Sequence, residues 1–214
     1  MGRLGDDYYL IAHDEHTGRL RVSARTAGIG AATALLAELI VDGHLVLRDG
    51  GLFPRFGRPP PADRFLRQVL GQVSLPRCDR DVGAWLRFLA VEAVEDLRDR
   101  LTADGLVAPV PRRTWAFARR TAHLPTDLNA AAWPAIRLAN ALSRGEALTL
   151  PDLLLAELVR VTGLTDDVLW LRPDHLPGRE RVTWLRAGLP PALAELAAHA
   201  EAAVGDGVLA RRGI

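Results

Sequence analysis

The sequence predicts a mainly α protein, a single globular helical domain (residues 1–214) around a central buried hydrophobic helix, with small β-hairpins. Three observations support this fold class. Residues 31–41 are almost uncharged, with Glu38 as the only charge. Several other segments place apolar residues at helical spacing. Asp-Gly steps follow two of these segments and lead into short runs that are typical of strands.

The central helix is expected within residues 28–47, which read GIGAATALLAELIVDGHLVL. Apolar residues cover nearly its whole circumference, and such a helix packs inside a domain. The run is also shorter than the roughly 20 apolar residues that span a bilayer. Gly28 and Gly30 are expected to permit a tight start and close packing. Asp42-Gly43 ends the helix, and His44–Arg48 alternates like a half-buried strand.

The segments before and after this helix are shorter. Residues 5–12 are expected to form a buried helical turn capped by Asp6 or Asp7, and residues 13–18 a polar turn. Residues 19–22 alternate like a strand. Leu52 and Phe53 are expected to begin the strand that returns alongside residues 44–48. A loop rich in Pro and Arg follows at 54–61.

The second half of the chain predicts further helices and one hairpin. We expect helices at 62–73, at 80–103 as one long or two joined helices, after the Thr126-Asp127 cap, at 151–161, and at 180–185 and 192–209. The hairpin is expected to pair 107–110 with 114–118 around a turn at 111–113. Residues expected on the core side of these helices include Phe88, Val91, Trp133 and Ile136.

The composition argues against a partner that is attracted by the net charge of the whole chain. The formal net charge is +1, and all 27 basic residues are Arg. No global field therefore draws the chain to nucleic acid or membranes, and an electrostatic partner must use a local patch. The lone Cys78 allows no internal disulfide, which fits a reducing cytoplasm. No signal-peptide pattern or transmembrane stretch is found, so a cytoplasmic location is expected, peripheral at the membrane if lipid is bound.

Catalytic and metal-binding motifs are weak. His13-Asp14-Glu15-His16 has metal-ligand residue types, but a solvated turn between two apolar stretches explains it fully and is the favoured interpretation. The pair Gly28 and Gly30 completes neither a phosphate loop nor a dinucleotide fingerprint. The remaining carboxylates are spaced like a solvated helix face. We therefore expect no catalytic residue, no metal site, no cofactor and no enzymatic activity.

The predicted 107–120 hairpin carries the sharpest surface signal, because basic residues bracket two aromatic ones. Arg interleaved with aromatic side chains suits phosphate-bearing surfaces. Alternatively, the aromatics cover the core or a subunit interface while the Arg residues are solvated. We expect this hairpin to contact a membrane or a second copy of the chain. The residues are Arg112, Arg113, Trp115, Phe117, Arg119 and Arg120.

Four stretches resemble the Golgi phosphoprotein 3 family, which also has bacterial members. They are YYLIAHDEHTGRL, AGIGAATALLAELIVDGHLVL, LRDRLTADGLVAPV with TWAFARRTAHLP, and LPDLLLAELVRVTGLTDDVLW. The resemblance implies a helical domain around a buried helix and a non-enzymatic peripheral role. In eukaryotes such proteins read phosphatidylinositol 4-phosphate and link it to glycosyltransferase tails. The family's hairpin can mediate self-association and touch the membrane.

The family's lipid pocket is not retained residue by residue. Its Trp aligns with Val22 or Ser23, its first Arg with Ala32, and its two later Arg with Val91 and Val94. A different anion site is expected from the Arg residues that lie nearby in sequence. These are Arg19, Arg21, Arg25, Arg98 and Arg100.

The sequence thus favours a non-enzymatic peripheral membrane or adaptor protein. Its expected partners are an anionic membrane lipid of the phosphatidylinositol 4-phosphate type, other proteins, and further copies of itself through the hairpin. The alternative is a nucleic-acid-binding regulator with winged-helix-like segments. That alternative is disfavoured by the near-neutral charge and by a candidate recognition helix, 31–41, that has no Arg or Asn to reach bases.

Overall fold

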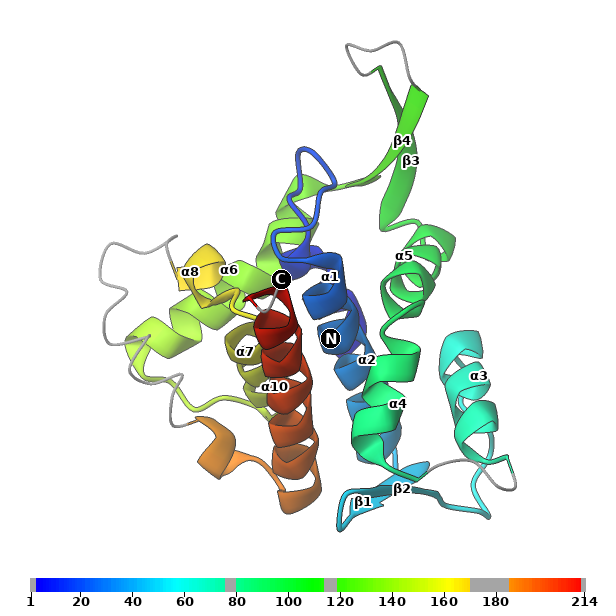
Figure 1. The fold of residues 1–214 in the computed structure, drawn as a ribbon. Helices are drawn as coiled ribbons and strands as arrows, with labels where there is room; N and C mark the ends of the chain where they lie inside the picture. The colour runs from blue at the N-terminus through cyan, green and yellow to red at the C-terminus, as the bar shows by residue number, and fades with distance from the viewer. Residues whose placement is uncertain (1–2, 76–79, 114–118, 170–184, 213–214) are drawn as a thin grey trace.

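The computed structural model describes residues 3–75, 80–113, 119–169 and 185–212, and it confirms a mainly α fold with two small hairpins (Figure 1). The elements are α1 (Leu4–Ala12), α2 (Ala24–Val41), β1 (Leu45–Arg48), β2 (Gly51–Pro54), α3 (Arg64–Val73), α4 (Val82–Leu89), α5 (Ala93–Ala103), β3 (Val107–Arg113), β4 (Arg119–Pro125), α6 (Leu128–Arg144), α7 (Leu150–Val161), α8 (Thr165–Leu169), the 3₁₀ turn η1 (Leu185–Gly188) and α10 (Pro191–Arg212).

Helix α2 is the predicted central helix, and helices α1, α4, α5 and α10 pack around it. It is long and apolar enough to cross a membrane by length and composition, but 67% of that window is buried inside the fold. It is therefore the core helix of the domain. One hydrophobic cluster runs from Leu4 to Ala203 around it.

Helix α2 begins earlier than the sequence suggested. Ser23 is its N-cap, and the Ser23 hydroxyl accepts a hydrogen bond from the Thr26 amide at 3.1 Å. Gly28 and Gly30 consequently lie inside the helix and not at its start. The predicted close packing is confirmed, because a Cβ at Gly28 would overlap the Ala90 carbonyl and a Cβ at Gly30 the Tyr8 hydroxyl.

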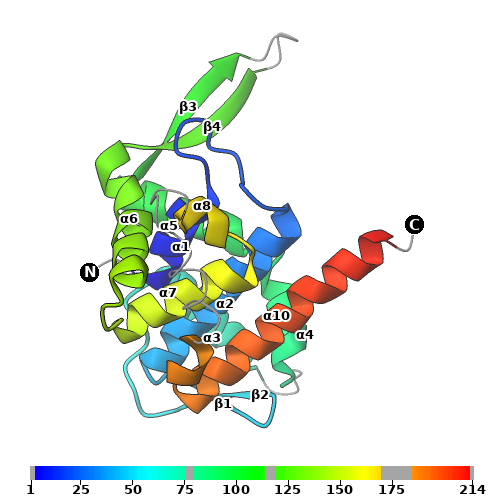
Figure 2. The same ribbon diagram turned by 90° about the vertical axis from the view of Figure 1, so that its left-hand side faces the viewer.

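Both hairpins are antiparallel. Strand β1 pairs with β2 from Leu45↔Pro54 to Arg48↔Gly51, as predicted. Strands β3 and β4 form the longer hairpin, which projects from the helical body (Figures 1 and 2). The predicted turn at 111–113 is wrong, because these residues belong to β3. Residues 114–118, with Trp115 and Phe117, lie outside the described residues.

Several local predictions change. Residues 19–22 form no strand, and only Leu20 makes an isolated bridge, to His13. Residues 80–103 form two helices, α4 and α5. The segment 180–185 lies outside the described residues except for Leu185, the first residue of η1.

Four apolar side chains expected in the core are exposed instead. The exposed fractions are 59% for Phe88, 80% for Val91, 56% for Trp133 and 39% for Ile136. The reason is geometric, since a surface helix offers the core only one stripe. In α4 that stripe is already filled by Trp85, Leu86 and Leu89, which are buried.

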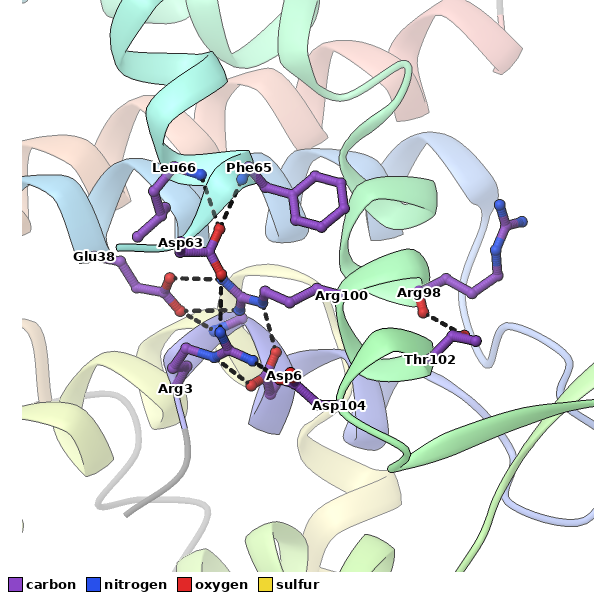
Figure 3. A network of polar contacts seen from close by, with 11 residues as sticks. Arg3, Asp6, Glu38, Asp63, Phe65, Leu66, Arg98, Arg100, Thr102 and Asp104 are labelled. Carbon is purple, nitrogen blue, oxygen red and sulfur yellow. Dashed lines mark hydrogen bonds and ion pairs between the residues drawn. The ribbon is translucent and has the colours of Figure 1, made fainter. Parts of the chain in front are cut away.

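A buried ion cluster joins α1, α2 and α5 (Figure 3). Arg100 is 2% exposed, and its guanidinium donates to Asp6 Oδ1 at 2.7 Å and to Glu38 Oε2 at 2.9 Å. Burial alone would lower the pKa of Arg100, but the hydrogen bond and charge of Glu38 and the charge of Asp6 outweigh it and raise that pKa. Glu38, the one charge of the apolar run, thus serves to pair Arg100.

Candidate anion-binding site

A surface cavity of about 350 Å³ lies where the first turn of α2 meets the end of α4. Two Arg residues and four apolar residues line it. They are Ala24, Arg25, Ile29, Arg87, Ala90 and Val91. A volume of this size is at the lower end of the range for small-molecule sites.

The local charge of this cavity is positive. The N-terminus of a helix carries a positive partial charge, and the first turn of α2 contains no acidic residue to offset it. Arg25 is exposed, and its side chain makes no ion pair with any residue that the structure describes. Arg87 contacts Asp81 at 3.8 Å, and both side chains are about half exposed. Two available cations at a helix N-terminus suit a phosphate or carboxylate.

Gly28 allows this cavity to exist in its present shape. Its missing Cβ lets α2 approach the Ala90 carbonyl directly. That approach brings the N-terminus of α2 beside the junction of α4 and α5, where Arg87 and Val91 lie.

Of the five Arg residues predicted for an anion site, only Arg25 lines this cavity. Arg100 is buried in its ion cluster, so it is not accessible to a surface ligand. Arg21 is held by Glu15 at 2.5 Å, with Asp14 and Asp167 within 3.8 Å. Arg98 pairs with Asp99 at 3.0 Å, and Arg19 is exposed away from the residues that line the cavity.

Arg87 was missed by the sequence reasoning, which treated the charges of 80–103 as a solvated face. A signal was present. Val91 is a position onto which a pocket Arg of the resembled family aligns, and Arg87 lies four residues before it. Arg87 belongs to the last turn of α4, and Val91 lies in the turn that follows this helix. Of the positions to which the family's pocket residues align, Val91 lines the cavity, and Arg87 supplies a charge there.

The register of the β3–β4 hairpin pairs Arg112 with Arg120 and Arg113 with Arg119, so these four residues of the predicted hairpin contact lie at the same end of the two strands.

A second surface combines apolar and acidic groups. A cavity of about 300 Å³ between α1 and α6 is lined in part by Leu106, Trp133, Asp7 and Arg137. The Arg137 guanidinium donates to Asp7 Oδ2 at 3.0 Å. Burial raises the pKa of Asp7 in spite of this contact. Trp133, a large apolar side chain that is 56% exposed, lies at the rim of this cavity.

The His13–His16 segment forms a turn. Asp14 Oδ1 accepts hydrogen bonds from the Thr17 amide and hydroxyl, both at 2.8 Å. The His13 ring stacks on Tyr9 with centroids 3.8 Å apart. Within the described part of the chain, no group of three His, Cys, Asp or Glu residues is placed to hold a metal ion.

His13 predicts a pH-dependent stability. Burial lowers the pKa of His13 from 6.5 to about 4. The unfolded state therefore binds this proton first as the pH falls, so the stabilisation is present above pH 6.5 and is lost between pH 6.5 and about 4. Its size is on the order of 3 kcal/mol. Urea unfolding of the wild type and of His13→Gln across this range measures it, with Gln expected to flatten the slope. Equal slopes in the two proteins would show that His13 does not contribute.

The family model described as Golgi phosphoprotein 3 (GPP34) matches residues 4–206 of the chain. No curated protein matches it.

Proposed function

Because the chain belongs to the Golgi phosphoprotein 3 family, we propose that it is a non-enzymatic peripheral membrane adaptor that binds anionic lipid headgroups. This family is not known for enzymatic activity. The observation that carries the proposal is the cavity at the N-terminus of α2, which Arg25 and Arg87 line together with Val91, one of the positions to which the family's pocket residues align. A phosphorylated inositol headgroup is the ligand class that the family favours.

Two features of the cavity support a phosphate ligand. Arg guanidinium groups bind phosphate oxygens through paired hydrogen bonds, and Arg25 and Arg87 come from different elements. The first turn of α2 adds peptide dipoles that point at the same space. Each Arg near an anionic membrane contributes about 1 kcal/mol, so the site alone binds weakly and benefits from further contacts.

The adaptor role requires protein contacts as well. The rim around Trp133, with Leu106 and Ile136 nearby on the surface, is the region we assign to a protein partner. Self-association is assigned to the β3–β4 hairpin, which projects from the body (Figure 2). Pairing hairpins would place the protein on a membrane in several copies, and multivalency strengthens weak lipid contacts.

The nucleic-acid alternative finds no support in the arrangement of α2. The recognition helix that it requires, 31–41, is the buried core helix, and Leu35, Leu36 and Leu39 on it are 0% exposed. A helix in this position cannot enter a DNA groove.

Charge reversal at the cavity tests the lipid proposal. Arg25→Glu and Arg87→Glu are each expected to weaken binding to anionic vesicles about 30-fold, because reversal changes about 2 kcal/mol of headgroup attraction. Co-sedimentation would use neutral vesicles, vesicles with phosphatidylserine, and vesicles with phosphatidylinositol 4-phosphate, at low and moderate salt. Selective binding to the phosphoinositide indicates a headgroup pocket. Binding to all anionic vesicles that fades with salt indicates a diffuse basic surface.

Arg67→Glu provides the matched control. Arg67 is exposed on α3, away from the cavity, and its reversal changes the net charge by the same amount. It is expected to retain most of the binding. If all three variants bind alike, the cavity is not the lipid site.

A further inference from the structure

An apolar patch adjoins the Arg25–Arg87 cavity. Phe88 and Val91 are 59% and 80% exposed at the end of α4 and in the turn before α5. They lie three residues apart, and the Val91 amide donates to the Phe88 carbonyl at 3.4 Å, so both belong to the same turn. Large side chains with such exposure are costly in water unless they have a partner.

This patch is continuous with the cations. Val91 lines the cavity together with Arg25 and Arg87, so an apolar surface borders a basic one within a single site. The adjacent Glu92 is also exposed and is expected to remain among headgroups or water. The side chains of Phe88 and Val91, and not that of Glu92, are therefore suited to an apolar environment without water.

The aromatic ring has a rigid support. The edge of Phe88 packs against Trp85 with ring centroids 5.6 Å apart, and Trp85 is 8% exposed. Trp85 belongs to the hydrophobic core cluster. Phe88 is thus held in place on the body, which lowers the entropy lost when it enters a partner.

We infer that Phe88 and Val91 insert into the acyl layer of the same membrane whose anionic headgroups occupy the Arg25–Arg87 cavity. This inference rests on the proposed function. The position of these apolar residues beside the two cations favours a bilayer over a protein partner, because a bilayer has an anionic headgroup layer directly above an apolar acyl layer. Interfacial elements that bind anionic membranes combine cations and large apolar residues in this way. The end of α4, beside the lipid cavity, then sets how the protein sits on the membrane.

Substitution tests the contribution of the patch. Phe88→Ser and Val91→Ser are each expected to lower partitioning onto anionic vesicles about 10-fold, from the loss of buried apolar area. Phe88→Ser should leave the binding of soluble inositol bisphosphate, followed by nuclear magnetic resonance, unchanged, because Phe88 is not among the residues that line the cavity and both cations remain. Phe56→Ser is the matched control. Phe56 is 81% exposed between Arg55 and Arg58 on a different loop, and its removal should leave partitioning unchanged.

A fluorophore at position 91 reports insertion directly. Cys78 is the only cysteine, so Val91→Cys in a Cys78→Ser background gives one attachment site for a polarity-sensitive dye, and Phe56→Cys gives the control site. Anionic vesicles should shift the emission of the dye at 91 to the blue and leave the dye at 56 unchanged.

The results of these experiments distinguish membrane insertion from the proposed headgroup binding on which it rests. Reduced partitioning of the two Ser variants, with unchanged inositol bisphosphate binding by Phe88→Ser and a blue shift at 91, supports insertion. Full vesicle binding by both Ser variants with no shift at 91 overturns insertion and leaves headgroup binding intact. Absence of vesicle binding by the wild type overturns both.

Discussion

Replacing Arg100 with Ala is expected to lower the free energy of unfolding by about 4 kcal/mol, the largest stability effect of any substitution considered. The reason is that the substitution leaves the buried carboxylate partners of Arg100 without its guanidinium. Arg100 is 2% exposed and holds Asp6 and Glu38, which belong to α1 and α2 (Figure 3). Without the guanidinium, the carboxylates of Asp6, Glu38 and Asp63 remain in a poorly solvated space, where Arg3 pairs with Asp6 and Asp63 but the ion pair of Glu38 with Arg100 is lost. Removing one partner from a buried pair costs more than the pair itself contributes.

Arg98→Ala is the matched control for this prediction. Arg98 lies two residues earlier in α5, and its side chain is 29% exposed with partners at the surface. Surface ion pairs contribute roughly 0–1 kcal/mol, so its loss should be small. Urea unfolding of the wild type and both variants, followed by circular dichroism, gives the comparison. Equal midpoints for Arg100→Ala and Arg98→Ala would contradict a structural role for the buried cluster.

The Arg100 cluster also shows where sequence reasoning fails. The sequence placed Arg100 with surface cations, because proximity along the chain cannot report which of two neighbouring helix positions points inward. Asp6 lies 94 residues from Arg100 and Glu38 lies 62 residues away. Such distant pairs become visible only once the helices are packed.

The central helix and the short hairpin were more predictable. Helix α2 contains an almost uncharged run that has no alternative to burial, and alternation identified β1 and β2 locally. The helical spacing of apolar residues predicted burial less well in helices that carry more apolar residues than their core-facing side can hold. Phe88 and Trp133 were assigned to the core because periodicity counts apolar residues and does not count the neighbours available to cover them.

The anion site was predictable in part. Arg25 was identified from its position before the central helix, whereas Arg87 was not, because its role depends on how α4 crosses α2. Gly28 lets α2 approach Ala90 closely; the sequence predicted this close packing but placed Gly28 at the start of the helix and not inside it. The packing of these two helices therefore determines both the core and the site.

Gly28→Ala is accordingly expected to destabilise the fold by about 3 kcal/mol, in spite of the higher helix propensity of Ala. The added Cβ would overlap the carbonyl oxygen of Ala90 and make tight contacts with its carbonyl carbon and Cα, which are backbone atoms and cannot escape by changing rotamer. Helix α2 and the α4–α5 junction must therefore separate. Gly71→Ala in α3 is the matched control, because a Cβ there meets no atom within 4 Å. It should leave stability unchanged or raise it by up to about 1 kcal/mol.

The same substitution tests whether packing and ligand binding are coupled. Separation of α2 from Ala90 moves Arg25 relative to Arg87, so Gly28→Ala should weaken binding to phosphatidylinositol 4-phosphate vesicles even at a temperature where the variant is fully folded. Gly71→Ala should bind like the wild type. A Gly28→Ala protein that is destabilised but binds normally would show that the two Arg residues act independently of their spacing. Loss of both properties together would place Gly28 at the point where the core helix determines the geometry of the lipid site.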